Sequence, residues 1–75
     1  MTWAVRVSGG ARVGTGAVLS EALVVTSEHV VSGVREADVR DETGATVKCE
    51  VVDRDPQLDV AVLAPVRPQA AAGAN

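Results

Sequence analysis

The sequence has almost no aromatic side chains: its 75 residues include one tryptophan and neither phenylalanine nor tyrosine. It also has no isoleucine and four leucines, whereas valine occurs 16 times. Hydrophobic residues still make up 47% of the chain, so a core is possible, but it must be built from small β-branched side chains. Such side chains fit strands better than helices, because a helix restricts their χ1 angle. This composition excludes collagen, coiled coils and an intrinsically disordered chain.

The sequence also has a single cysteine, no long apolar run and no excess of positive charge. Cys49 is the single cysteine, which excludes an internal disulfide and a cysteine-based zinc site, and we interpret it as a small core residue. No apolar run approaches the ~20 residues that cross a bilayer. The net charge is −3, with no basic patch dense enough to neutralise phosphates. We therefore expect neither a membrane nor a nucleic acid as partner, and nothing implies a metal or organic cofactor.

The length allows one small domain, whose stability is marginal because a chain this short buries only about 60–65% of its unfolded surface. We expect residues 1–64 to form this domain. Residues 65–75 contain prolines, alanines and glycine without periodicity and are predicted to be a linker or a disordered tail. The first residues lack the charged start and apolar stretch of a secretory signal, so we expect a cytoplasmic location or a place inside a larger protein.

Alternation of apolar and polar residues predicts an all-β chain of six strands joined mostly by short turns. The predicted strands are residues 3–8, 11–20, 22–26, 35–41, 45–53 and 60–63. Residues 27–34 do not alternate and are predicted to form a loop with one helical turn, and residues 54–57 a polar loop. This spacing of strands suits a small antiparallel β-barrel.

The pattern also predicts which side chains share a face of each strand. In the second strand Gly14 and Gly16 lie on one face, where the lack of a side chain permits close approach of another backbone. Val13, Thr15, Ala17 and Leu19 share the opposite face of that strand. The side chains predicted to face inward in the fourth and fifth strands are Ala37, Val39, Val47, Cys49 and Val51. Trp3 is predicted to plug the end of the barrel.

The candidate site residues are His29 and Asp59, which both lie where a buried strand meets a loop. Rigid strands can present side chains precisely at such junctions. A histidine oriented by a carboxylate is the base of a nucleophilic hydrolase, because the imidazole takes up a proton while the carboxylate fixes its tautomer. Composition alone does not favour this interpretation, since a lone histidine is more often a surface residue and an aspartate before a strand is often a turn residue.

Three segments in order resemble the N-terminal half of trypsin-like serine peptidases, in particular the bacterial HtrA-type branch. They are GTGAVL at 14–19, VVTSEHVV at 24–31 and DPQLDVAVL at 55–63, and the resemblance covers residues 11–64. It implies half of the chymotrypsin fold, with His29 as general base and Asp59 as the residue that orients it. Asp55 is expected to close the turn before Pro56. The triplet TSE at 26–28, before His29, departs from the small or asparagine residues common there in the family, and Glu28 adds an unexplained charge beside the imidazole.

The resemblance also implies that the chain supplies only part of an active site. Family members have two six-stranded barrels, and the second barrel carries the serine nucleophile, the oxyanion hole and the specificity pocket. No G-x-S-x-G segment occurs in these 75 residues, so no serine has the flanking glycines that orient a nucleophile. The four serines of the sequence are Ser8, Ser20, Ser27 and Ser32. We expect the chain to be inactive alone.

An incomplete two-barrel enzyme should expose the face that its second half would cover. The expected partners are therefore a second β-barrel half, a partner chain or a second copy bound through the exposed cleft face, and a peptide or protein substrate once the site is complete. Two alternatives remain open: a catalytically dead β-barrel that binds proteins, and an unrelated SH3- or OB-like barrel. In an unrelated barrel the His29 imidazole and the Asp59 carboxylate would not lie within hydrogen-bond reach.

Overall fold

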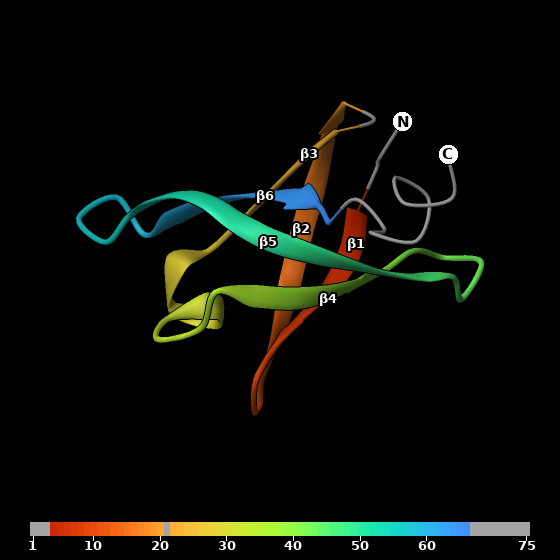
Figure 1. Ribbon diagram of the computed structural model, residues 1–75, viewed down its shortest axis with the longest axis horizontal. Coiled ribbons are helices and arrows are strands. Elements are labelled where there is room, and N and C mark those ends of the chain that lie inside the picture. The colour runs from red at the N-terminus through yellow and green to blue at the C-terminus, as the bar shows by residue number, and fades with distance from the viewer. Residues whose placement is uncertain (1–3, 21, 67–75) are drawn as a thin grey trace, which may run out of the picture.

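A computed structural model describes residues 4–20 and 22–66, which form a closed six-stranded barrel (Figure 1). Its elements are β1 (Ala4–Gly9), β2 (Arg12–Ser20), β3 (Leu23–Thr26), the 3₁₀ turn η1 (Glu28–Val31), β4 (Glu36–Arg40), β5 (Thr46–Asp55) and β6 (Val60–Pro65). Every pair of neighbouring strands is antiparallel, in the order β1-β2-β3-β6-β5-β4. The predicted all-β barrel is confirmed. Trp3 and most of the predicted tail lie outside the described residues.

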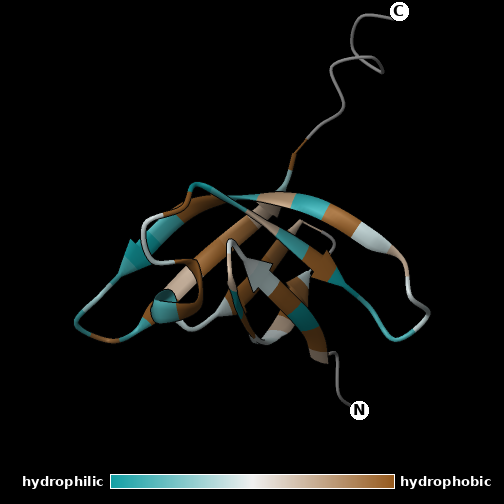
Figure 2. Cartoon of the chain, turned by 90° about the horizontal axis from the view of Figure 1, so that it is seen from below, coloured by the Kyte–Doolittle hydropathy of each residue, from teal (hydrophilic) through white to brown (hydrophobic). Residues whose placement is uncertain are grey.

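Strands β1–β3 and β4–β6 run in different directions and cross at a steep angle, so the barrel is short and strongly twisted (Figure 1). Apolar and polar residues alternate along the strands (Figure 2). Because successive side chains point to opposite faces of a strand, this alternation builds an apolar interior. The buried residues of the core are Val5, Val7, Val24, Val30, Val31, Ala37, Val39, Cys49, Ala61 and Leu63. No helix within the described ranges is long and apolar enough to cross a membrane.

The inner face of β2 is its glycine face. Gly16 is buried and Gly14 half-buried, whereas Val13 and Leu19 on the opposite face are exposed. A Cβ atom added to Gly14 would lie 2.5 Å from Cγ2 of Val30, far inside van der Waals contact. The lack of a side chain at Gly14 therefore lets η1 pack directly against β2, with Val30 and Val31 buried in the core.

Strand β5 differs from its prediction in two ways. Val47 was expected to face inward, but it is half-exposed because it lies at the rim of the barrel, beside an opening of about 260 Å³. The strand also continues to Asp55, through residues predicted to be a loop. A bulge explains the extra length: Val51 pairs with Leu63 and Asp53 with Val62, which leaves Val52 without a partner in the ladder. The expected inward orientation holds for Cys49, Ala37 and Val39.

Candidate functional site

His29 lies in η1, which is separated from the end of β3 by one residue. The turn is closed by a hydrogen bond from the Val30 N–H to the Ser27 carbonyl (3.1 Å), and Val30 and Val31 anchor it in the core. His29 directly precedes these two buried valines, and its own side chain is 66% exposed. The short turn therefore fixes the backbone of His29 on the barrel while its imidazole faces solvent.

Asp59 lies in the tight turn that joins β5 to β6. The Asp55 carboxylate accepts hydrogen bonds from the N–H groups of Gln57 (3.0 Å) and Leu58 (3.2 Å), which is the expected role of Asp55 in closing this turn. The Asp59 N–H donates to the Pro56 carbonyl (3.3 Å). A network of local hydrogen bonds thus holds the segment that presents Asp59 just before β6.

The backbone of Asp59 has a left-handed conformation, with φ of 57°. Among the described residues it is the one non-glycine residue with positive φ. Aspartate tolerates this region better than most side chains, because its short carboxylate can bond locally. Backbone strain of this kind persists where surrounding contacts enforce it, and it occurs here at a candidate site residue.

The structure brings His29 and Asp59 together although they are 30 positions apart. Oδ2 of Asp59 lies 2.8 Å from Nδ1 of the imidazole, and Oδ1 accepts the backbone N–H of His29 at 2.9 Å. One carboxylate therefore holds both the ring and the main chain of the histidine. The contact expected from the sequence is present, and an accidental likeness to an unrelated barrel does not explain it.

These two hydrogen bonds also set the charge of the carboxylate. The backbone N–H of His29, and then its ring, hold the pKa of Asp59 below the usual value for an aspartate, because both bonds favour the ionised form. An ionised carboxylate at Nδ1 favours the tautomer in which Nδ1 carries the proton. In that tautomer the lone pair is on Nε2, the nitrogen that can accept a proton in a reaction.

Two arginines also contact the loop that carries His29, and sequence reasoning did not single them out. Arg12 donates from Nη1 to the His29 carbonyl (2.8 Å), and Arg54 donates to three acceptors in or beside η1. Glu28, whose charge beside the histidine the sequence left unexplained, pairs with Arg54. No local pattern could reveal these contacts, because Arg12 is 17 positions from His29, and Arg54 is 26, 23 and 20 positions from its three acceptors.

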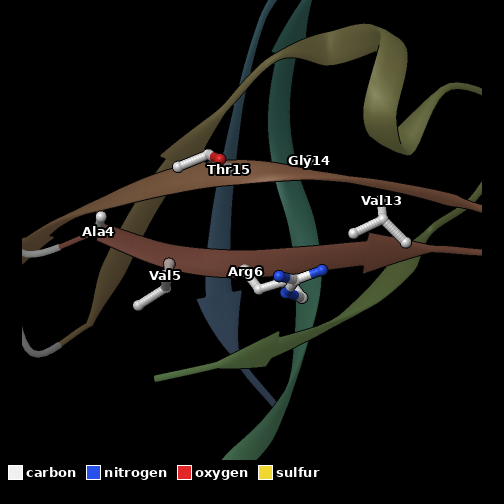
Figure 3. A pocket seen from close by; sticks show the side chains of 6 residues that line it. All are labelled: Ala4, Val5, Arg6, Val13, Gly14 and Thr15. Carbon is white, nitrogen blue, oxygen red and sulfur yellow. The ribbon is translucent and has the colours of Figure 1, made fainter. Parts of the chain in front are cut away.

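Other features of the described residues offer less chemistry. A hollow of about 430 Å³ lies over β1 and β2; His29 does not line it, and Arg6 is its one charged lining residue (Figure 3). It is lined by Ala4, Val5, Arg6, Val13, Gly14 and Thr15. No serine among residues 4–20 and 22–66 hydrogen-bonds the His29 ring, and no cluster of three histidine, cysteine or acidic residues there could hold a metal ion. The His29–Asp59 pair is therefore the candidate site.

Comparisons with known proteins agree with this fold. The family described as the trypsin-like peptidase domain matches residues 14–74. The crystal structure of the Rv3671c protease in an inactive form superposes with a TM-score of 0.77 and 34% identity, covering 85% of this chain and 32% of that one. An inactive serine-to-alanine mutant of Rv3671c from M. tuberculosis H37Rv gives a TM-score of 0.75 and 35% identity, covering 84% of this chain and 30% of that one.

A more distant structure shows how widely the fold is shared. The serine endoprotease from Yersinia pestis gives a TM-score of 0.76 at 24% identity, covering 89% of this chain and 29% of that one. The chain thus spans about a third of the length of the solved proteins that it matches. No curated protein matches it.

Proposed function

Because the chain belongs to the trypsin-like peptidase family, we propose that it is the N-terminal half of a serine peptidase domain and supplies its general base and orienting aspartate. The observation that carries the proposal is the double hydrogen bond from the Asp59 carboxylate to the ring and backbone of His29. In this role Nε2 of His29 takes the proton from a serine hydroxyl as it attacks a peptide carbonyl, and later donates it to the leaving amine. Asp59 holds the imidazole in the required tautomer and stabilises the imidazolium that forms.

The chain by itself should be inactive. These 75 residues contain no G-x-S-x-G segment, and the nucleophile and oxyanion donors of the family reside in a second barrel. The groups of a catalytic triad act as a unit, so a base and its orienting acid retain little catalysis without a nucleophile. The substrate class that follows is a peptide or protein, bound once the site is complete.

The gene sequence after Asn75 tests this proposal. We expect it to encode a G-x-S-x-G segment in the same frame, and we expect the longer product to hydrolyse peptide substrates while the 75-residue chain does not. Hydrolysis is measured as release of a fluorogenic leaving group. A stop codon or an unrelated domain after Asn75 would contradict the proposal and support the alternative, a catalytically dead interaction module.

We also propose that a second barrel covers the face around His29 and Asp59. Leu58 supports this, because it directly precedes Asp59 and is 72% exposed although apolar. Burying such a side chain against a partner is favourable by about 1.5–3 kcal/mol. When the second barrel is missing, another copy of the chain is expected to cover the same face.

Light scattering of the isolated chain should therefore give the mass of a dimer at high micromolar concentration. Leu58→Asp should shift the mass to that of a monomer, because a charge would be buried in the interface. Leu19→Asp provides the matched control, since Leu19 is similarly exposed but lies at the opposite end of the barrel. A monomeric parent chain, or equal effects of the two substitutions, would count against this interface.

A further inference from the structure

Arg54 connects the strand that leads to Asp59 with the turn that carries His29. Its Nη1 donates to Oε2 of Glu28 and to the Val31 carbonyl, both at 3.2 Å. Its Nη2 donates to the Val34 carbonyl at 2.5 Å. Val31 ends η1, and its carbonyl accepts the Val34 N–H (3.2 Å) as well as the bond from Arg54. One guanidinium therefore contacts the beginning of η1 through Glu28 and its end through Val31.

This ion pair is not an ordinary surface contact. The Glu28 side chain is 12% exposed and the Arg54 side chain is partly buried, so water screens their attraction only in part. Removing one partner would leave the other charge in a poorly solvated position, which is costly. Lysine could replace Arg54 only in part, because a single ammonium keeps the charge but lacks the planar fork that reaches several acceptors at once.

The bulge in β5 is what points Arg54 toward η1. Before the bulge, Cys49 and Val51 face the interior, so simple alternation would turn residue 54 outward. The extra residue, Val52, reverses the alternation, and Arg54 pairs in the ladder with Ala61, which is fully buried. Residues directly opposite each other in a ladder share a face, so Arg54 points to the inner side, where η1 closes the barrel.

The next residue, Asp55, closes the turn that presents Asp59. The last two residues of β5 therefore support both parts of the candidate site from opposite faces of the strand. Arg54 contacts the His29 turn, and Asp55 closes the turn that carries Asp59. We propose that Arg54 and Glu28 are positioning residues that fix the His29 turn against Asp59. This inference rests on the proposed role of His29 as general base, and neither positioning residue touches the reacting atoms.

NMR of the 75-residue chain tests the proposal through His29 itself. The readouts are hydrogen exchange of the His29 amide, which donates to Asp59, and the ring ¹⁵N shifts, which report whether Nδ1 carries the proton. Arg54→Met should speed exchange of this amide by at least about tenfold and reduce the fraction of the Nδ1–H tautomer, because charge-assisted bonds are lost. Glu28→Gln should act in the same direction, and Arg54→Lys should restore only part of the effect.

Arg40→Met is the matched control. Arg40 is exposed and ends β4, whereas η1 precedes the start of that strand, and loss of Arg40 changes the net charge by the same amount as loss of Arg54. It should leave His29 unchanged. Unaltered His29 exchange and tautomer in both Arg54→Met and Glu28→Gln would overturn the proposal. So would an equal rise in exchange for the strand amides of β1 and β6, since Arg54 would then support the barrel as a whole. The catalytic proposal fails separately, if His29→Ala leaves turnover intact in the completed peptidase.

Discussion

His29→Ala is expected to lower kcat of the completed peptidase domain by about 10⁶-fold, as removal of a base from a triad does. The alanine cannot accept the serine proton, and Asp59 then has no imidazole to orient. The barrel should remain folded, because the His29 side chain is mostly exposed and contributes little to the core. Initial rates with a fluorogenic peptide measure the first effect, and circular dichroism measures the second.

Asp59→Asn separates orientation from proton transfer at the same site. Asparagine tolerates the left-handed backbone of Asp59 and has nearly the same size, so the turn should persist. Its amide can donate to Nδ1 and favour the wrong tautomer, and the expected loss in kcat is about 10⁴-fold. Glu50→Gln, an exposed substitution on β5, should leave kcat unchanged. Hydrolysis that survives His29→Ala would mean that another group serves as the base.

Leu63→Ala is expected to destabilise the barrel by about 2–5 kcal/mol, the usual cost of emptying a buried leucine site. Leu63 is fully buried, and it pairs with Val24 on one side and Val51 on the other. A domain of this size has a total stability of only about 4–11 kcal/mol, so the substitution should remove a large share of that stability. Urea denaturation followed by circular dichroism gives the change in free energy of unfolding.

Leu19→Ala is the matched control, since it removes the same atoms from a side chain that is 63% exposed and lies outside the proposed interface. Its effect on the free energy of unfolding should stay within about 0.5 kcal/mol. Similar losses in both variants would contradict the described core. Molecules of Leu63→Ala in which the barrel is unfolded should also lose the His29–Asp59 contact, because β6 begins directly after Asp59.

Much of the candidate site could be predicted from the sequence because its parts are short, continuous segments. The segment around His29 and the segment from Asp55 to Leu63 each combine a buried strand with a polar junction. This pattern made both residues candidates, and the resemblance to trypsin-like peptidases then favoured them as a base and its orienting acid. Asp55 could be assigned to its turn for the same reason. Glu28 could not be explained, since its partner Arg54 belonged to a stretch that reads as a polar loop.

The sequence by itself determined the six strands and the valine-rich core, because alternation and turn residues act over a few neighbouring residues. It determined the candidate pair through three short segments that resemble those of trypsin-like peptidases. Only the tertiary structure decided that the glycine face of β2 is the inner one, since Val30 must arrive from another element to fill the space beside Gly14. The β5 bulge, likewise, is set by pairing with β6, and it turns Arg54 toward the histidine loop. Closing the barrel joins residues 26 and 30 positions apart, a distance over which local pattern carries no information.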